Sequence, residues 1–160
     1  MSHVTLGFST KKDDWLSRLI CWATSWRHSH VVLVSPDGQM IVESTSFPFP
    51  DPQTGEWRTG CRMVPVAYLM NRDVVELREV AHPDPLAVWE HAVKMATENV
   101  EYDHEYIRDW IFRRPKNGNS KKVTCHELIE VCAERAGHRL FAADLRHTSP
   151  RDLYLISKEL

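Results

Sequence analysis

The sequence has no long apolar run, and its first residues lack the features of a secretory signal. No stretch approaches the roughly 18 consecutive apolar residues that a membrane-spanning helix needs. Residues 1–5 contain no charged lead followed by an apolar segment, so no signal peptide is evident. We therefore expect a cytoplasmic protein without a transmembrane segment, in which the cysteine thiols stay reduced.

An excess of charge of one sign is also missing. Of the 160 residues, 26% are charged, and the formal net charge is only −2. Proteins that bind nucleic acids normally carry a clustered basic face, which this composition does not suggest. The one basic run, from Arg113 to Lys122, surrounds Asn117-Gly118-Asn119-Ser120 and is interpreted as a solvated loop. We expect no nucleic-acid partner.

The four cysteines show none of the spacings of a structural zinc site, so we expect no metal and no cofactor. Cys125 and Cys132 are too far apart for a disulfide, because seven residues of a predicted helix span about 10 Å. A metal site built from His28, His30 and Cys125 is an alternative, since alternate residues of a strand share a face. A further ligand for that site is not evident.

The elements that the sequence does contain predict a single α+β domain over residues 1–160. Such a chain, 42% hydrophobic, is long enough to bury one core. The turn Ser35-Pro36-Asp37-Gly38 joins two apolar runs and predicts a β-hairpin. Residues 47–60, rich in proline and glycine, predict a long loop. The pattern predicts strands at 3–9, 30–34, 40–43, 61–66 and 74–80, a short helical turn at 66–70, and helices at 13–26, 85–99, 102–112 and 125–136. This order favours a small antiparallel sheet packed against helices.

Cys125 stands where a reactive cysteine belongs. Thr124 followed by Glu127 fits a capping box, which places Cys125 at the first position of a helix. Free backbone N–H groups and the helix dipole favour a thiolate there, and the thiolate is the nucleophilic form. A cysteine that merely packs in the core is the alternative. Cys132, in the middle of the same predicted helix, fits that alternative well.

His30 is the candidate base for this thiol. It begins a strand of apolar residues, where an imidazole needs a partner, and Glu43 lies on the other strand of the hairpin. If the two side chains share a face, the carboxylate holds the imidazole in one tautomer. A solvent-exposed pair is the alternative. His28 is the nearest rival base, whereas His126 points roughly 100° away from Cys125 along the helix and is interpreted as a structural residue or a residue at the rim of the site.

The helix predicted at 13–26 carries tryptophans among basic residues. Trp15, Trp22 and Trp26 follow helical spacing, with Lys11 and Arg18 nearby. The simpler interpretation is a helix that packs into the core. The other interpretation is that some tryptophans line an apolar groove or touch a membrane surface, so peripheral membrane contact is possible.

Several segments together resemble one family of cysteine hydrolases. They are Ser29-His30-Val31-Val32, Glu43, Cys125-His126-Glu127-Leu128-Ile129, and more weakly Val100-Glu101-Tyr102-Asp103 and Ser149-Pro150-Arg151-Asp152-Leu153. In this order they resemble the circularly permuted NlpC-type papain-like proteins, of the YiiX-like branch related to lecithin–retinol acyltransferase. His126 stands where the family usually has serine, and Val32 where glycine is common.

The resemblance implies a permuted papain-like fold, in which the Cys125 helix packs on a sheet carrying His30 and Glu43. It implies thiolate attack on an acyl carbonyl, with Tyr102 or Tyr106 as an assisting tyrosine. The expected substrate is a small molecule, a peptide or an acyl compound. Three functions are compatible with this resemblance. They are an amidase or peptidase, a thioesterase or lipid acyltransferase, and a non-catalytic lipid- or ligand-binding module.

Overall fold

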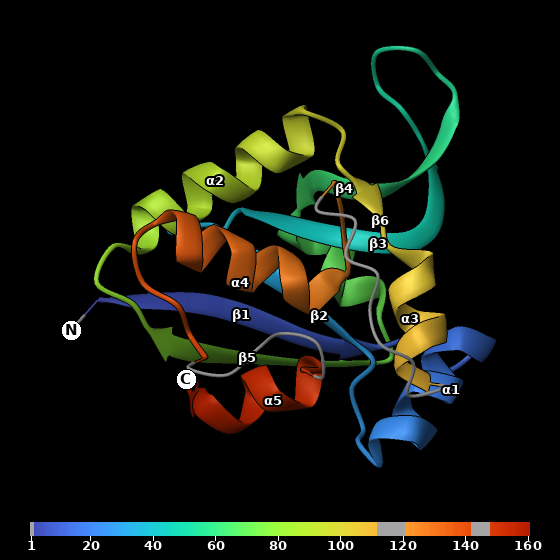
Figure 1. Ribbon diagram of the computed structural model, residues 1–160, viewed down its shortest axis with the longest axis horizontal. Coiled ribbons are helices and arrows are strands. Elements are labelled where there is room, and N and C mark those ends of the chain that lie inside the picture. Colours follow the sequence, from blue (N-terminus) through green and yellow to red (C-terminus); the bar gives the residue numbers. More distant parts are fainter. Residues whose placement is uncertain (1, 112–120, 142–147) are drawn as a thin grey trace.

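The computed structural model describes residues 2–111, 121–141 and 148–160. Most of the predicted basic loop at 113–122 lies outside these residues. Six strands form one antiparallel sheet in the order β4-β3-β2-β1-β5-β8 (Figure 1). They are β1 (His3–Thr10), β2 (His30–Val34), β3 (Met40–Pro50), β4 (Trp57–Pro65), β5 (Val74–Ala81) and β8 (Lys158–Glu159). Two short strands, β6 (Glu101–Tyr102) and β7 (Lys122–Val123), pair in parallel beside the sheet.

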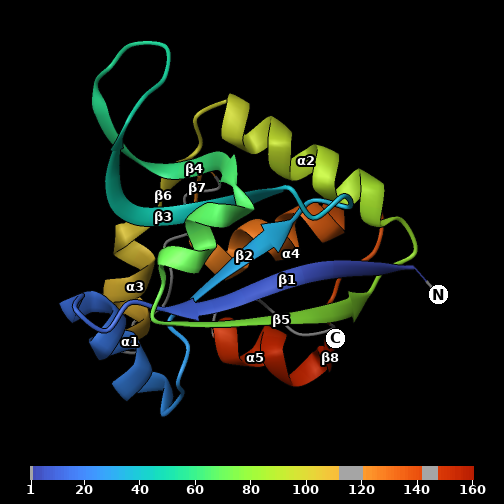
Figure 2. The ribbon, with the colours of Figure 1, turned by 180° about the vertical axis from the view of Figure 1, so that it is seen from behind.

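The helices lie mainly against one face of the sheet, which confirms the α+β prediction. Figures 1 and 2 show α2 and α4 stacked over one face, with α5 below them and α1 and α3 at one end. The 3-10 helix η1 covers the opposite face through Leu69, which packs on Val32 and Ile41. The helices are α1 (Trp15–Thr24), η1 (Val66–Asn71), α2 (Pro85–Thr97), α3 (His104–Ile111), α4 (Cys125–Arg135) and α5 (Pro150–Ile156).

The main core lies between the sheet and the α2–α4 layer. Alternate residues of β1 and β2 point into it, among them Leu6, Phe8 and Leu33, and they meet Leu128 and Ile129 of α4. The tip of the β2–β3 hairpin is the predicted turn, with Gly38 at a positive φ of 71°. Among the described residues, no helix is both long enough and apolar enough to cross a bilayer.

The prediction of a long loop over residues 47–60 is wrong. Strands β3 and β4 continue through much of it, with Phe49 opposite Arg58, after a register shift beyond Thr45. Prolines are tolerated in this stretch because β2 pairs with β3 only near Val42, so the outer part of β3 has a neighbour on one side. Residues 150–156, for which the sequence pattern predicted no helix, form α5.

Two of the three tryptophans near α1 do not pack into the core. Trp15 and Trp22 are 73% and 77% exposed, and only Trp26, just beyond the helix, is half-buried. The interpretation of this segment as a core-packing helix is therefore wrong for its outer face. The inner face buries Ser17 and Thr24 instead.

Candidate functional site

His30 and Glu43 share one face of the hairpin and form a close pair. Val32 lies opposite Glu43 by the register of β2 and β3, and residues two apart on a strand point the same way. Nε2 of His30 lies 2.5 Å from Oε2 of Glu43. Both side chains are buried, so the alternative of a solvent-exposed pair is excluded. The bond uses Nε2, which leaves Nδ1 as the ring nitrogen available to a nucleophile.

Two arginines hold the Glu43 carboxylate. Arg62 donates to Oε1 from Nε at 2.9 Å and from Nη2 at 2.6 Å, and Arg72 donates to Oε2 at 3.3 Å. Burial by itself would raise the pKa of Glu43, but the bond from His30 and the charges of the arginines lower it to about 2. The carboxylate is therefore ionised at neutral pH and fixed in place, although Glu43 is only 1% exposed. Neither arginine stands in a sequence pattern that predicts this role.

Cys125 begins α4, as the capping box predicts. The N–H of Thr124 donates to the Glu127 carboxylate at 2.9 Å, and Oγ1 of Thr124 donates to the same oxygen at 3.0 Å. Ser44 of β3 donates to the carbonyl of Val123 at 2.7 Å, which attaches the start of α4 to the sheet. These bonds bring the thiol to the end of the sheet where the His30 imidazole lies.

Two imidazoles, those of His30 and His126, act on the Cys125 thiol. Burial by itself would raise its pKa, but bonds with His126 and His30 and the charges of both rings lower it to about 6. In turn, burial would lower the pKa of His30, but its bonds with Cys125 and Glu43 raise it above the usual value. The two shifts favour a thiolate–imidazolium pair. The structure therefore brings together the three residues singled out as catalytic: Cys125, His30 and Glu43.

His126 lies closer to the thiol than helical geometry alone suggests. Its ring is buried, with Nδ1 3.2 Å from Oγ1 of Thr124 and Nε2 3.3 Å from the Tyr106 hydroxyl. Its interaction with the Cys125 thiol helps to lower the pKa of that thiol. The interpretation of His126 as a structural or rim residue did not include an effect on the thiol, because the angle between neighbouring helix positions does not fix side-chain rotamers.

Both candidate tyrosines line the cavity at Cys125. This cavity and a second one beside His30 each hold about 20 Å³ of free space, and Tyr102 borders both. The Tyr106 hydroxyl is used elsewhere, since it donates to the carbonyl of Thr148 at 2.9 Å. Burial and the charge of Cys125 raise the pKa of Tyr102, so its hydroxyl stays protonated as a potential donor.

Helix α1 covers these two cavities. Ile20 contributes to both of them, Thr24 contributes to the one at Cys125, and Ser17 contributes to the one at His30. A cavity of about 20 Å³ accommodates little more than one water molecule. A larger substrate therefore requires side chains of α1 or its neighbours to move.

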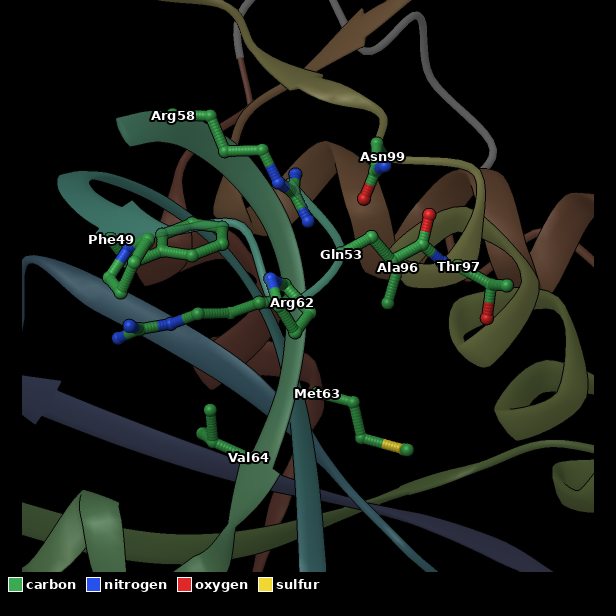
Figure 3. Close-up of a pocket in the computed structure, with 11 residues that line it drawn as sticks. Phe49, Gln53, Arg58, Arg62, Met63, Val64, Ala96, Thr97 and Asn99 are labelled. Carbon is green, nitrogen blue, oxygen red and sulfur yellow. The ribbon is translucent and has the colours of Figure 1, made fainter. Parts of the chain in front are cut away.

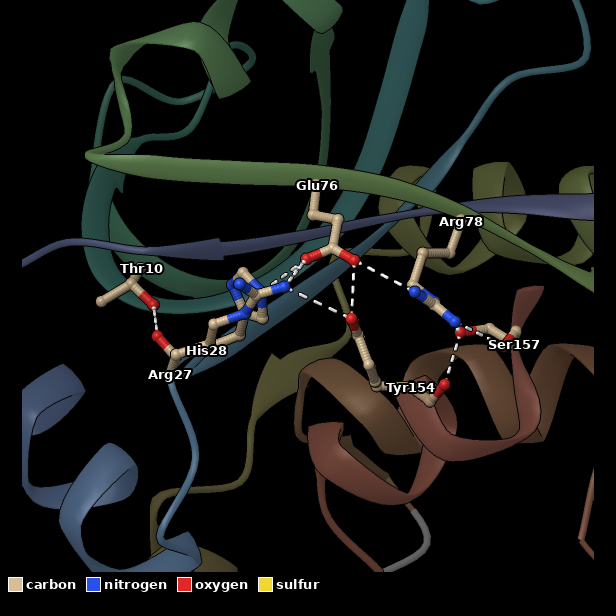
Figure 4. Close-up of polar contacts among 7 residues, drawn as sticks. All are labelled: Thr10, Arg27, His28, Glu76, Arg78, Tyr154 and Ser157. Carbon is tan, nitrogen blue, oxygen red and sulfur yellow. Dashed lines mark hydrogen bonds and ion pairs between the residues drawn. The ribbon is translucent and has the colours of Figure 1, made fainter. Parts of the chain in front are cut away.

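His28, the rival base, belongs to a different cluster. Its Nε2 lies 3.2 Å from Oε2 of Glu76, a carboxylate that also accepts from Tyr154 at 2.7 Å and from Arg78 at 3.0 Å (Figure 4). Burial lowers the pKa of His28. His28 and His30 therefore have different partners, which argues against His28 as the base and against a metal site shared by both histidines.

A wider pocket lies along the edge strand β4, away from Cys125 and His30. It encloses about 420 Å³ between β4, the end of α2 and the outer part of β3 (Figure 3). Arg58 and Arg62 lie on either side of Phe49 there, with guanidinium-to-ring distances of 4.6 and 4.8 Å. Arg62 also bonds to Glu43, but none of the described residues that line the pocket is a cysteine or a histidine. Volume alone therefore does not locate the candidate chemistry.

No protein-family model matches the chain, and no curated protein matches it. Its chemistry is therefore inferred from its own residues.

Proposed function

We propose that this protein is a cysteine hydrolase or acyl-transfer enzyme with a permuted papain-like fold. The observation that carries the proposal is the buried His30–Glu43 pair, whose carboxylate is held by Arg62 and Arg72 and whose imidazole lowers the pKa of the Cys125 thiol at the start of α4. This places a base and its orienting carboxylate beside a candidate nucleophile, as nucleophilic catalysis requires. The order of the three residues along the chain is the one that the family resemblance implies.

The proposed reaction begins with the thiolate of Cys125. Its sulfur attacks the substrate's acyl carbonyl, and the protonated His30 gives its proton to the departing amine, alcohol or thiol. The product of this half-reaction is an acyl-cysteine and a neutral imidazole. His30 then removes a proton from water, or from the hydroxyl or amine of an acceptor, and the new bond to the acyl group expels the thiolate.

Two donors are available to the oxyanion of this reaction. The backbone N–H of Cys125 is at the start of α4, where the first N–H groups have no partner within the helix. The hydroxyl of Tyr102 borders the same cavity. Tyr106 is less suited to this role, because its hydroxyl donates its proton to the carbonyl of Thr148. We assign Tyr106 to positioning the ring of His126, whose Nε2 lies beside the same hydroxyl.

An acyl substrate without fixed charge fits the cavity better than a charged peptide. The lining at Cys125 is mostly apolar, including Ile20, Ile107 and Pro150. Among the described lining residues of both cavities, Arg72 is the one arginine or lysine, and it already bonds to Glu43. A thioesterase or acyltransferase is therefore favoured over an amidase for charged peptides. A non-catalytic binding module with the same fold is the competing hypothesis.

Activity measurements on matched variants test this proposal. We expect hydrolysis of a p-nitrophenyl or thioester acyl series, with Cys125→Ala and His30→Ala each lowering the rate by roughly three or more orders of magnitude. His28→Ala is the matched control, since it removes a buried histidine of the other cluster, and it should keep most of the activity. Cleavage of a D-glutamyl dipeptide series alone would contradict the acyl preference. Binding of acyl compounds without any turnover would support the non-catalytic module.

The orienting role of Glu43 is tested separately. Glu43→Gln keeps the side chain's shape but removes the charge that Arg62 and Arg72 face, so we expect a loss of roughly ten- to a hundredfold in kcat. The pH at which activity rises should also move, because the His30 imidazolium loses its acceptor. Unchanged activity and an unchanged pH profile would show that Glu43 has no part in the reaction.

A further inference from the structure

The two small cavities near the start of β2 differ in the character of their walls. The cavity at Cys125 is mostly apolar, whereas the cavity at His30 is lined chiefly by polar side chains, among them Ser17, Thr45 and Ser46. The cavity at His30 has about 20 Å³ of free space, which accommodates one water molecule but no larger acyl acceptor. A buried water needs roughly two to four polar partners. The polar cavity therefore suits water, and the apolar cavity suits the acyl group.

Ser29 borders both cavities and carries a buried hydroxyl. Its N–H donates to the carbonyl of Ser9 at 3.2 Å, which holds the backbone just before His30. The residue is 3% exposed, and its Oγ has no hydrogen-bond partner within the described part of the chain. Ser29 does act on the thiol of Cys21, but sulfur is a weak hydrogen-bonding partner. Burial of a hydroxyl without a strong partner is unfavourable, and a water in the adjoining polar cavity would offset that cost.

A second hydroxyl of the cavity at His30 has a proton to donate. Oγ1 of Thr45 accepts from the N–H of Phe47 at 3.1 Å, which leaves its own proton for a further acceptor. Thr45 is 1% exposed and lines the cavity together with His30 and Ser29. A water there can accept from Thr45 and donate to Ser29. Its second proton is then available to the imidazole of His30.

We propose that the cavity beside His30 binds the water that hydrolyses the acyl-cysteine, and that Ser29 accepts a hydrogen bond from this water. The water site stands on the cavity and the Ser29 hydroxyl, whereas its role in hydrolysis rests on the proposed function. Nδ1 of the neutral His30 takes one proton of the water while the water oxygen attacks the acyl carbon. The new C–O bond expels the thiolate of Cys125 as the C–S bond breaks, so the products are a carboxylic acid, a thiolate and an imidazolium. The acyl acceptor is therefore water rather than the hydroxyl of a larger alcohol.

Rapid-mixing kinetics with a p-nitrophenyl acyl ester separate the two half-reactions. The initial burst of p-nitrophenol reports the formation of the acyl-cysteine, and the later steady rate reports its hydrolysis. We expect Ser29→Ala to keep the burst rate within about twofold and to lower the steady rate by roughly tenfold or more. With glycerol present as a competing acceptor, the wild type should release the free acid rather than the glycerol ester.

Ser9→Ala is the matched control for Ser29→Ala. Ser9 is also buried, and its Oγ likewise has no hydrogen-bond partner within the described residues. Ser9 is not among the described residues that line either cavity, so its variant should change neither rate. Both variants should unfold at about the urea concentration of the wild type, because neither removes a hydrogen bond between protein groups. A crystal structure of the wild type should show an ordered water bonded to Oγ of Ser29 in the cavity beside His30.

Four outcomes would overturn the proposal. They are a crystal structure in which Ser29 Oγ bonds to protein groups alone, a Ser9 variant that loses as much steady rate as the Ser29 variant, a Ser29 variant whose burst slows as much as its steady rate, and a wild type that forms mainly the glycerol ester. A wild type that shows the ordered water but no burst with any acyl ester would refute the proposed function, and with it the role in hydrolysis, while the water site would stand. Failure of the water site and failure of the proposed function are therefore separate results.

Discussion

The four cysteines of this protein differ in their electrostatic surroundings far more than in their burial. Cys61, Cys125 and Cys132 are all buried, yet desolvation raises the pKa of Cys61 and of Cys132 to about 12, whereas two imidazoles bring that of Cys125 to about 6. Cys21 is half-buried and its pKa is also raised. The difference comes from partners, because burial acts in the same direction on all four thiols.

Alkylation therefore distinguishes Cys125 from the others. At about pH 6 iodoacetamide should label Cys125 first, because only there is a substantial fraction of the thiol ionised. Peptide mass spectrometry identifies the site, and the rate against pH should show an inflection near 6 for Cys125. In His30→Ala the inflection should move upward. Prior labelling of the more accessible Cys21 would refute the assigned nucleophile.

The start of α4 connects the stability of a helix to the reactivity of a thiol. The capping bonds between Thr124 and Glu127 hold the first turn, and Cys125 is the first residue of that turn. Helix α2 has a comparable cap, in which Asp84 accepts from Ala87 at 3.0 Å, but that helix carries no site residue. Removing the α4 cap therefore weakens a helix start that carries Cys125, whereas removing the α2 cap weakens a helix start that carries no site residue.

Removing each cap should separate stability from chemistry. Glu127→Ala and Asp84→Ala should each lower the free energy of unfolding by about 1 kcal/mol, measured by urea denaturation. Only Glu127→Ala should slow alkylation of Cys125 at about pH 6, because the frayed turn no longer directs its N–H groups and dipole at the sulfur. Equal alkylation rates in the two variants would mean that the helix start does not activate the thiol.

The elements with strong local signals could be predicted from the sequence, and those that depend on distant partners could not. Strand β2, the Pro36-Asp37-Gly38 turn and the start of α4 follow from β-branched residues, turn chemistry and a capping box. The outer part of β3 was missed because its prolines are acceptable only where β2 has ended. Helix α5 was missed although Ser149 and Asp152 form a capping box, a signal that was present in the sequence.

The same division holds for the candidate site. Cys125, His30 and Glu43 could be named from position and pattern, since each is an ionisable group at an informative place in a predicted element. Arg62 and Arg72 could not, because an arginine on a strand or after a short helix has no local mark that distinguishes it from a solvated one. The role of Arg62 depends on the register of β3 and β4, which places it opposite Glu43, and the role of Arg72 depends on where η1 ends in the folded chain.

At the scale of the whole molecule, two ionised carboxylates hold distant segments together. Glu43 links β2, β3 and β4, and Glu76 links β5 to the residues before β2 and to α5 through Tyr154. Burial would raise the pKa of Glu76, but the bonds from Tyr154, Arg78 and His28 and the charge of Arg27 lower it to about 2. Neither carboxylate is more than 17% exposed, so both lose strong interactions when they are protonated.

The stability of the fold should therefore fall in acid. Both folded pKa values lie below the value of about 4.3 for an unfolded glutamate, so the unfolded chain binds more protons in this range. The stabilisation is complete above about pH 4.5 and is lost as the pH falls toward 2, on the order of a few kcal/mol. Urea midpoints at about pH 6 and about pH 3 measure this loss.

A single variant checks the contribution of Glu76. Glu76→Gln should be less stable than the wild type at about pH 6 and should show a smaller further loss at about pH 3, because one of the titrating groups is gone. Glu98→Gln is the matched control, since Glu98 is exposed and its salt bridge is the long contact with Lys94 at 3.7 Å. If the stability of Glu76→Gln fell between about pH 6 and about pH 3 as much as that of the wild type, Glu76 would not be one of the groups responsible for the acid sensitivity.

Strand β5 lies between β1 and β8, the first and last strands of the chain. The order of the site residues along the polypeptide therefore depends on where the new termini would be placed in a circular permutation. Glu79 of β5 pairs with Thr5 on one side and with Lys158 on the other. A flexible linker of roughly eight to ten residues would span from the last residue to the first around this strand. If the exposed Pro83 then began the chain, the strand pairings would be unchanged. The polypeptide would run from thiol to imidazole to carboxylate, so a circularly permuted chain and the present one can encode the same three-dimensional site.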